Sequence, residues 1–198
     1  MRRVLIATSN AGKLRDFAGA AAAHGITIAS LPDFDSLPSV REDGATFEAN
    51  ARKKAEHYSR FAPGEIVLAD DSGLEVNALG GAPGVHSARY AAISPEENAD
   101  DRANNARLLR ELTQGADRSA RFVCVIAAAR DGHTLSTFRG DADGLILEAP
   151  RGSGGFGYDP LFFFPALGKT FAELAPEEKA AVSHRGAAFR KFLEWKER

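Results

Sequence analysis

Along the chain, hydrophobic residues recur with two spacings, one typical of buried strands and the other of helices that bury one face. A short apolar run at residues 4–7 predicts a buried strand, and apolar residues then recur at helical spacing from Leu14 to Ala21. Further apolar runs at residues 66–69 and 121–129 predict two more buried strands. The chain therefore combines strands and helices from its first residues onward.

Residues that typically begin helices indicate where several helices lie. Thr46 is a suitable cap for a helix over residues 47–61, because its hydroxyl can accept a hydrogen bond from a free backbone N–H of the first turn. Ser94, with a glutamate three residues later, matches a capping box, and Pro95 suits the first helical position. This pattern predicts a helix that starts at Pro95 and continues to Leu112.

The second half of the chain carries the patterns of a hairpin and of a helical segment. An Asp-Gly pair at residues 131–132 predicts a tight turn between the strand at 121–129 and an antiparallel partner at 134–139. Residues 144–148 predict a separate strand, and residues 176–196 have helical spacing. Ser183 is a suitable N-cap at which this last helix could start again. Since strands and helices are mixed rather than strictly alternating, we predict an α/β fold with a mixed central β-sheet flanked by helices.

Length and composition narrow the class of protein. A chain of 198 residues fits one domain of ordinary size, or at most two small ones, and we expect a single domain over residues 1–198. Hydrophobic residues make up 44% and charged residues 26% of the chain, which excludes an intrinsically disordered or collagen-like protein. The formal net charge of -2 argues against a protein that coats nucleic acid, because such domains are usually strongly basic.

The single cysteine and the lack of long apolar segments bear on where the protein works. Cys124 has no second cysteine with which to form a disulfide or a thiolate zinc site, and one free thiol is compatible with a reducing compartment. No stretch approaches the ~18 apolar residues of a membrane span, and the run at residues 4–7 is too short for a signal peptide. We therefore expect a cytoplasmic protein with no membrane association.

The polar turn after the first predicted strand has the composition of a phosphate site. A turn from a strand into a helix exposes backbone N–H groups at the positive end of the helix dipole. This turn adds short polar side chains and one lysine, in the order Thr8, Ser9, Asn10, Ala11, Gly12, Lys13. The spacing of a Walker A loop is absent, and a capped helix with one solvated lysine is the alternative interpretation.

Two adjacent aspartates, Asp70 and Asp71, follow the apolar run at residues 66–69. Neighbouring carboxylates are costly unless a positive charge compensates them, and Mg²⁺ with phosphate ligands is a suitable compensator. Successive side chains on a strand point to opposite faces, so we expect only one of the pair to face the site directly. We place both at a strand end, where ligand sites gather in open α/β sheets; the alternative is a polar turn with an aspartate cap.

A glycine-rich loop at residues 152–160 presents two aromatic side chains and a carboxylate. Its glycines match the spacing G-x-G-x-x-G, but Tyr158, Asp159 and a proline follow where a dinucleotide-binding helix should begin, so we reject that interpretation. An aromatic ring such as that of Phe156 can stack on a base, and a carboxylate can accept a hydrogen bond from one. The alternative is a turn in which Phe156 packs into the core.

A cluster of basic residues lies in the last helical segment. Lys179, His184 and Arg185 are close to a predicted helix start, where cations do not stabilise a helix. An anionic or oxo-group ligand accounts for them better than helix stability does, with a solvated charged face as the alternative. The other histidines show no metal-ligand spacing.

Taken together, these segments resemble the inosine triphosphate pyrophosphatase-like family, the non-standard purine nucleoside triphosphate pyrophosphatases, in its bacterial branch. The resemblance implies an elongated α/β fold with two lobes, an active-site cleft between them, and a homodimer. It also implies Mg²⁺-dependent hydrolysis of ITP, dITP and XTP to the monophosphate and pyrophosphate, which removes deaminated purines from the nucleotide pool. The matching segments, which follow the family's order and span nearly the whole chain, are residues 8–13 (TSNAGK), 70–74 (DDSGL), 80–84 (GGAPG), 87–90 (SARY), 154–160 (GGFGYDP) and 183–185 (SHR).

The resemblance also implies roles for individual residues. It implies that residues 8–13 bind the triphosphate and that Glu42 and Asp71 bind the metal, with the adjacent Asp43 as the alternative to Glu42. It also implies that Asp71, or Asp70 beside it, is the general base. It places Lys54 near the phosphates, where it would act in catalysis together with the lysine that ends the 8–13 segment. The residues implied to contact the base and the rest of the substrate are Ser72, Phe156, Gly157, Tyr158, Asp159, Lys179, His184 and Arg185.

Other functions stay open alongside this one. The same residues could serve a pyrophosphatase for another modified nucleotide, or a non-catalytic nucleotide sensor. Adjacent carboxylates count against the sensor, because a protein that only binds a polyanion is better served without them. An RNA-binding module is disfavoured by the near-neutral charge and by the lack of a repeated aromatic and basic pattern.

Overall fold

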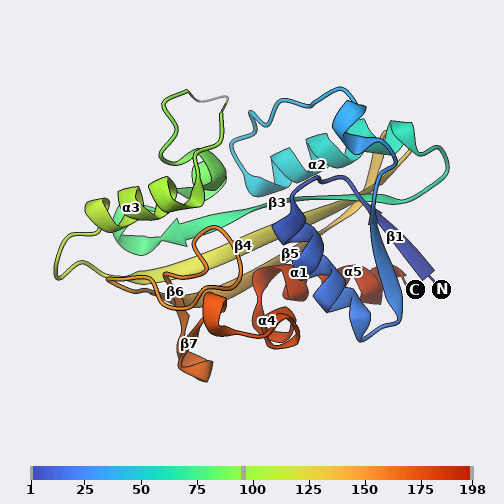
Figure 1. The fold of residues 1–198 in the computed structure, drawn as a ribbon. Helices are drawn as coiled ribbons and strands as arrows, with labels where there is room; N and C mark the ends of the chain where they lie inside the picture. Colours follow the sequence, from blue (N-terminus) through green and yellow to red (C-terminus); the bar gives the residue numbers. More distant parts are fainter. Residues whose placement is uncertain (1, 95–96, 197–198) are drawn as a thin grey trace. The chain divides into compact units, whose positions relative to one another are not determined.

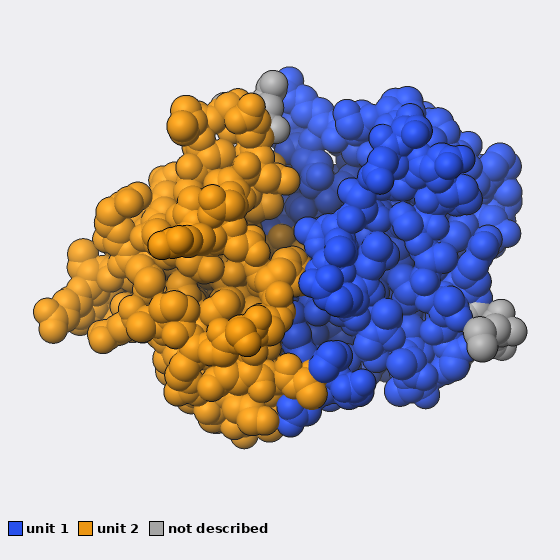
Figure 2. Space-filling model, viewed as in Figure 1, with its two compact units in different colours: residues 1–71, 124–141, 176–198 blue, residues 72–123, 142–175 orange. Residues whose placement is uncertain are grey.

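The structure of the protein is a computed structural model that describes residues 2–94 and 97–196. The chain divides into two compact units, which Figure 2 colours separately. Unit 1 consists of Met1–Asp71, Cys124–Asp141 and Pro176–Arg198, and unit 2 consists of Ser72–Val123 and Ala142–Ala175. The expectation of one domain over residues 1–198 stays a prediction.

Within the described ranges the strands form a seven-stranded sheet in the order β2-β1-β3-β4-β5-β6-β7. β1 runs parallel to β2 and to β3, whereas β6 runs antiparallel to β5 and to β7, so the prediction of a mixed sheet is confirmed. The strands are β1 (Arg2–Ile6), β2 (Ile26–Ser30), β3 (Val67–Val76), β4 (Ser119–Arg130), β5 (His133–Ile146), β6 (Phe162–Phe164) and β7 (Lys169–Thr170).

Helices flank this sheet, as the sequence predicts. In unit 1, Figure 1 shows α2 on one side of the strands and α1, α4 and α5 on the other. None of the described helices combines the length and the apolar character that crossing a membrane requires. The helices are α1 (Ala11–Ala22), α2 (Phe47–Tyr58), α3 (Asp101–Glu111), α4 (Pro176–Val182) and α5 (His184–Lys196).

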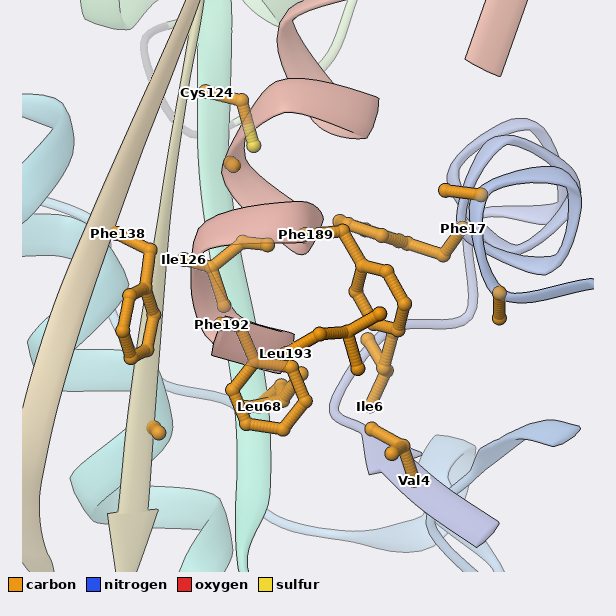
Figure 3. Close-up of a cluster of buried hydrophobic side chains, with 14 of the residues drawn as sticks. Val4, Ile6, Phe17, Leu68, Cys124, Ile126, Phe138, Phe189, Phe192 and Leu193 are labelled. Atoms are coloured by element: carbon orange, nitrogen blue, oxygen red, sulfur yellow. The ribbon is translucent and has the colours of Figure 1, made fainter. Parts of the chain in front are cut away.

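The core of unit 1 fixes α1 and α5 against the strands. Phe17 of α1 and Phe189 of α5 lie with their ring centroids 6.1 Å apart, and Phe192 packs beside them (Figure 3). Ile6 of β1 and Ile126 of β4 complete this cluster, and all five side chains are almost fully buried. Burial of each such side chain stabilises the fold by roughly 1.5–3 kcal/mol, so the middle turns of both helices are fixed against the strands.

The core of unit 2 is a cluster of aromatic rings. The Phe122 ring lies 4.6 Å from that of Phe162 and 5.8 Å from that of Phe171, measured between centroids. Aromatic pairs at these separations add to the stabilisation from burial alone. The segment after Phe171 also holds the glycine-rich loop, because the Gly154 backbone N–H donates to the Ala172 carbonyl at 3.0 Å.

The predicted strand end at the two aspartates is wrong. β3 runs without interruption from Val67 to Val76, so Asp70 and Asp71 both lie in the interior of a strand. Charged residues are rare in such places because burial removes them from water. Here each carboxylate faces its own set of cationic and amide partners, and those partners replace the lost hydration.

The prediction of separate strands at residues 134–139 and 144–148 is wrong. The structure has one strand there, β5, whose side chains alternate between buried and exposed from Phe138 to Ile146. A Cβ atom on Gly140 would lie 2.2 Å from the His184 carbonyl oxygen, and one on Gly144 would lie 2.5 Å from the Phe163 carbonyl oxygen. These glycines admit close backbone neighbours and do not end the strand.

The helix predicted to start at Pro95 begins later, at Asp101. Its N-cap is Asp100, whose carboxylate accepts a hydrogen bond from the Ala103 backbone N–H at 2.7 Å. Ser94 lies in a turn instead, with its carbonyl accepting from the backbone N–H three residues later. Pro95 itself lies outside the described residues.

Other local predictions are confirmed. Thr46 caps α2 by accepting a hydrogen bond from the Ala49 backbone N–H at 3.1 Å. Asp131 and Gly132 have φ values of 50° and 85°, which fits the two-residue turn predicted between β4 and β5. Ser183 separates α4 from α5, and its hydroxyl accepts from the Gly186 N–H at 3.1 Å.

Candidate active site

The predicted phosphate turn joins β1 to α1, and hydrogen bonds between residues close in sequence fix its shape. Asn10 caps α1 by accepting a hydrogen bond from the Lys13 backbone N–H at 3.0 Å, and Thr8 Oγ1 accepts one from the Asn10 N–H at 3.1 Å. Ser9 and Ala11 are exposed, so the turn is open to a ligand. The predicted strand, turn and helix are confirmed, and the first turn of α1 presents backbone N–H groups suited to an anion.

Asp70 faces α1 and α5 and is held there by cations. Its two carboxylate oxygens lie 3.0 and 2.9 Å from the Lys13 ammonium, and the Arg185 guanidinium lies 3.9 Å away. Burial alone would raise the pKa of Asp70, but the charges of Lys13 and Arg185 outweigh it and lower the pKa to about 2. Asp70 is therefore ionised at neutral pH and serves as the counter-ion of Lys13.

Asp71 points to the opposite face of β3, toward α2. One carboxylate oxygen accepts a hydrogen bond from the Asn50 amide at 3.0 Å, and the other lies 3.5 Å from the Lys54 ammonium. Burial raises the pKa of the Asp71 carboxyl above its ordinary value, and the Glu42 carboxylate adds to this, while Lys54 opposes both. A carboxylate with a raised pKa is a stronger base than an ordinary aspartate.

Asn50 connects Asp71 to the loop that carries Glu42. Its Oδ1 accepts a hydrogen bond from the Gly44 backbone N–H at 2.7 Å, while its amide nitrogen donates to Asp71. A Cβ atom on Gly44 would lie 2.6 Å from this Oδ1, so the close approach requires glycine. The Glu42 carboxylate then meets the Lys54 ammonium at 2.7 Å.

The pair Glu42 and Asp71 fits a hard divalent cation. Among the described residues, no group of three or more His, Cys, Asp or Glu side chains is placed to hold a metal by itself. The two carboxylates do converge on one positive group, the Lys54 ammonium, from 2.7 and 3.5 Å. Mg²⁺ typically takes one or two protein carboxylates and completes its shell with water and phosphate oxygens, so this pair suits Mg²⁺ bound together with a polyphosphate.

The basic residues of α4 and α5 gather around one aspartate of α1. Asp16 accepts hydrogen bonds from the Lys179 ammonium at 3.1 Å and from the Arg185 guanidinium at 3.0 Å. His184 is 1% exposed, and burial, together with the charges of Arg185 and Lys179, lowers its pKa well below the ordinary value. His184 is therefore neutral at physiological pH, so the positive charge of this cluster comes from Lys179 and Arg185.

Two side chains of the glycine-rich loop of unit 2 hold its shape by hydrogen bonds, one within the loop and one to Ser87. Asp159 accepts a hydrogen bond from the Phe156 backbone N–H at 2.9 Å, and the Tyr158 hydroxyl donates to the Ser87 carbonyl at 2.8 Å. Tyr158 and Asp159 are buried, whereas Phe156 and Gly157 are half-buried. Asp159 and Tyr158 thus shape the loop, and Phe156 is the aromatic residue of the loop with surface left for a ligand.

The charged residues predicted for the site form two groups in unit 1, and five further predicted residues lie in unit 2. In unit 1, contacts of 3.9 Å or less link Lys13, Asp70, Arg185 and Lys179 through Asp16 on one face of β3, and Glu42, Lys54 and Asp71 on the other. In unit 2, the predicted residues are the half-buried Ser72 on β3 and the four residues of the glycine-rich loop.

Sequence reasoning missed Asn50 and Asp16, although a signal existed for each. Asn50 and Lys54 are four residues apart on the buried face of a helix whose other members are apolar, which is unusual for polar side chains. Asp16 lies three residues after Lys13, and residues at this spacing share a helix face. Both patterns identify polar side chains that need partners from elsewhere in the fold.

A mixed sheet with a phosphate-type turn after β1 and cation-compensated carboxylates on β3 defines an α/β protein with groups suited to an anionic ligand. Comparison with known proteins identifies its family. A sequence profile described as the Ham1 family matches residues 4–195, and the chain belongs to this family.

Relatives of known name match over the whole length. The chain is 52% identical over 200 residues to a dITP/XTP pyrophosphatase of Geobacillus kaustophilus, with 100% of this chain and 96% of that protein covered. It is 51% identical to a dITP/XTP pyrophosphatase of Thermus thermophilus, with 97% and 90% covered.

Solved structures of Ham1 proteins share the fold. The Staphylococcus aureus Ham1 protein matches with a TM-score of 0.82 at 41% identity, and the alignment covers 99% of this chain and 98% of that one. The Coxiella burnetii HAM1 protein matches with a TM-score of 0.83 at 39% identity, and both chains are covered completely. The predicted α/β fold with a mixed sheet flanked by helices is thereby confirmed, whereas the two lobes and the cleft between them stay a prediction.

Proposed function

We propose that this protein hydrolyses non-standard purine nucleoside triphosphates, namely ITP, dITP and XTP, to the monophosphate and pyrophosphate, with Mg²⁺ as cofactor. The observation that carries the proposal is that the two adjacent aspartates of β3 have different partners and opposite pKa shifts. Asp71 has a raised pKa and shares a cation with Glu42, while its neighbour Asp70 is ionised and holds Lys13. The names of the full-length relatives support the same substrate class.

The phosphate end of the substrate has a suitable set of donors in unit 1. The first turn of α1 offers backbone N–H groups, and the 8–13 segment adds hydroxyl and amide side chains. Lys13 adds the positive charge of this set, since its side chain is 17% exposed while that of its partner Asp70 is 1% exposed. We assign Lys13 to the leaving pyrophosphate, whose negative charge it would stabilise as the bond to phosphorus breaks.

The chemical step needs a base beside an attacking water. Bound Mg²⁺ would neutralise phosphate charge and lower the pKa of a coordinated water. Glu42 and Asp71 would hold the metal, and Asp71 would accept the proton that the water loses on attacking the α-phosphorus. Lys54, which sits between Glu42 and Asp71, is free to turn to the phosphates when a divalent cation takes its place. Asp70 keeps Lys13 in place and takes no part in proton transfer.

Base selection is assigned to the loop 156–159 and to the cluster on α4 and α5. The cations Lys179 and Arg185 can donate to a 6-oxo group, whereas the 6-amino group of adenine would leave such donors unpaired. His184 is neutral, so it can donate a hydrogen bond without adding charge. Phe156 can stack on the purine ring. Ser72 is assigned to the substrate as well.

A nucleotide panel tests the proposal. Pyrophosphate release is measured from ITP, XTP, dITP, GTP and ATP, with and without Mg²⁺. We expect fast, metal-dependent release from the first three only. Release confined to a modified pyrimidine nucleotide would indicate another pyrophosphatase, and release from none by a folded protein would favour a nucleotide sensor.

The proposal extends to the setting in which the enzyme works. We propose a homodimer in the cytoplasm that acts on free nucleotides rather than on nucleic acid. The formal net charge of -2 and the family resemblance support this. Light scattering on the purified protein tests the dimer, and a monomer at assay concentration would refute it.

A further inference from the structure

Helix α3 is hydrogen-bonded to the glycine-rich loop of unit 2 at one residue, Gly157. The Gly157 backbone N–H donates to the Asp101 carboxylate at 2.7 Å, and the Gly157 carbonyl accepts from the Asn105 amide at 3.0 Å. Asp101 and Asn105 are four residues apart, so they lie on the same face of α3. One helix face therefore holds both polar backbone groups of a single loop residue.

Gly157 has a backbone conformation that residues with a side chain rarely adopt. Its φ is +61°, in the left-handed region, and glycine adopts negative φ values just as readily, so glycine alone does not fix this conformation. Hydrogen bonds to both of its backbone groups fix the directions of the peptide groups on either side. Phe156 and Tyr158 are joined to Gly157 by those two peptide groups. The contact with α3 therefore also restricts the backbone of both aromatic residues.

A contribution to stability does not explain why position 105 is an asparagine. Its Oδ1 is buried and has no hydrogen-bond partner among the described residues, and a buried unsatisfied acceptor is destabilising. Its other end makes the bond to the Gly157 carbonyl. An apolar side chain of similar size would avoid the unsatisfied oxygen, so the asparagine is better explained by what it does to the loop.

We propose that Asp101 and Asn105 are positioning residues that set the purine selectivity of the enzyme by fixing the backbone at Gly157. This inference rests on the proposed function, in which the loop 156–159 contacts the base. Neither residue is assigned a contact with the nucleotide. They act through the loop, so their loss should affect recognition of the base more than the chemical step.

The test compares variants at neighbouring positions of α3. Asp101→Ala removes the acceptor for the Gly157 N–H, whereas Asp101→Asn keeps an amide oxygen that can take its place. Asn105→Leu removes the donor and also the unsatisfied oxygen. Asp100→Ala is the matched control, because it removes the cap of the same helix and leaves both bonds to Gly157 in place.

Two readouts are measured on each variant. The first is the ratio of kcat/KM for ITP to that for ATP, with KM and kcat reported separately. The second is the exchange rate of the Gly157 amide hydrogen by NMR, together with the thermal midpoint. We expect Asp101→Ala and Asn105→Leu to lower the ratio about tenfold, mainly through KM for ITP, since a hydrogen bond to a charged or buried group is worth about one decade.

The control separates positioning from general stability. Asp101→Ala should speed exchange at Gly157, Asp101→Asn should restore most of the selectivity, and Asn105→Leu should lose selectivity without a lower thermal midpoint. Asp100→Ala should lower the thermal midpoint and keep the wild-type ratio. Equal ratios in Asp101→Ala and Asp100→Ala would overturn the proposal.

Failure of the proposed function gives a different result. If the wild type hydrolyses no nucleotide in the panel, the proposed function falls, and the selectivity role falls with it. If the wild type is active and selective but Gly157 exchanges equally fast in all variants, the activity stands and the positioning role is refuted.

Discussion

Asp70 and Asp71 are adjacent in sequence, and the structure predicts that neutralising Asp70 lowers stability whereas neutralising Asp71 does not. Asp70→Asn removes a carboxylate that two cations stabilise, and it leaves Lys13 and Arg185 without that partner. Asp71→Asn removes a carboxylate whose charge burial disfavours. The two substitutions are isosteric, so differences in packing do not obscure the comparison.

The magnitude for Asp70 follows from its pKa. A folded-state pKa of about 2, compared with 3.8 for an unperturbed aspartate, corresponds to roughly 2 kcal/mol of stability. Since the folded pKa is the lower one, this contribution is complete above about pH 4 and is lost as the pH falls toward 2. In a chain of this length, about 2 kcal/mol at neutral pH corresponds to a thermal midpoint about 4–8 °C lower. Asp71 has a raised pKa, so Asp71→Asn should leave stability unchanged or increase it.

The assay is urea unfolding at several pH values between 7 and 2, in EDTA so that no metal contributes. We expect the difference between wild type and Asp70→Asn to be about 2 kcal/mol at pH 7 and to disappear near pH 2. Asp71→Asn should show no loss of stability, and it should abolish pyrophosphate release while retaining the fold. A difference for Asp70→Asn that is the same at pH 7 and pH 2 would refute the charge-pair reasoning, and full activity in Asp71→Asn would remove Asp71 from the mechanism.

Three further predictions concern single positions. Gly44→Ala should displace Asn50, because its Cβ would lie 2.6 Å from the amide oxygen, and the Mg²⁺ concentration for half-maximal turnover should rise; an unchanged metal dependence would contradict this. Tyr158→Phe should cost about 1–3 kcal/mol in urea unfolding, because the buried Ser87 carbonyl loses its donor, and wild-type stability would show that the bond is unimportant. Burial raises the pKa of the Cys124 thiol, so a thiol reagent should label it only in the unfolded protein; rapid labelling of the native state would contradict that.

The sequence predicted the fold class and many local elements because the relevant signals are short-range. Caps such as Thr46 and the turn at residues 131–132 depend on neighbouring residues, and the structure has them as expected. The continuous strands were mispredicted because their cause is not local. The residue at position 140 within β5 is glycine because the α5 backbone leaves no room for a Cβ atom there. No feature of the neighbouring sequence indicates that contact.

The site was predictable in its residue types but not in its pairing. Motifs identified Asp70, Asp71 and Lys13, yet the sequence left open which carboxylate was the base. Which face of β3 each side chain occupies depends on the register of that strand against α1 and α2. Asn50 and Asp16 were missed for the same reason. Each pairs with a residue from a distant segment, and the role of a polar helix residue can be inferred only when that partner is known.

The order of segments in unit 1 has a consequence for synthesis on the ribosome. Its core joins residues at both ends of the sequence, since Ile6 packs in the same cluster as Phe189 and Phe192. At about 5–20 residues per second, the nascent chain carries β1 for roughly 9–40 seconds before α5 has been translated. The apolar faces of β1 and α1 are without their final partner throughout that interval. We expect chaperones that recognise exposed apolar segments to engage this N-terminal region, and truncation before α5 to yield an aggregation-prone chain.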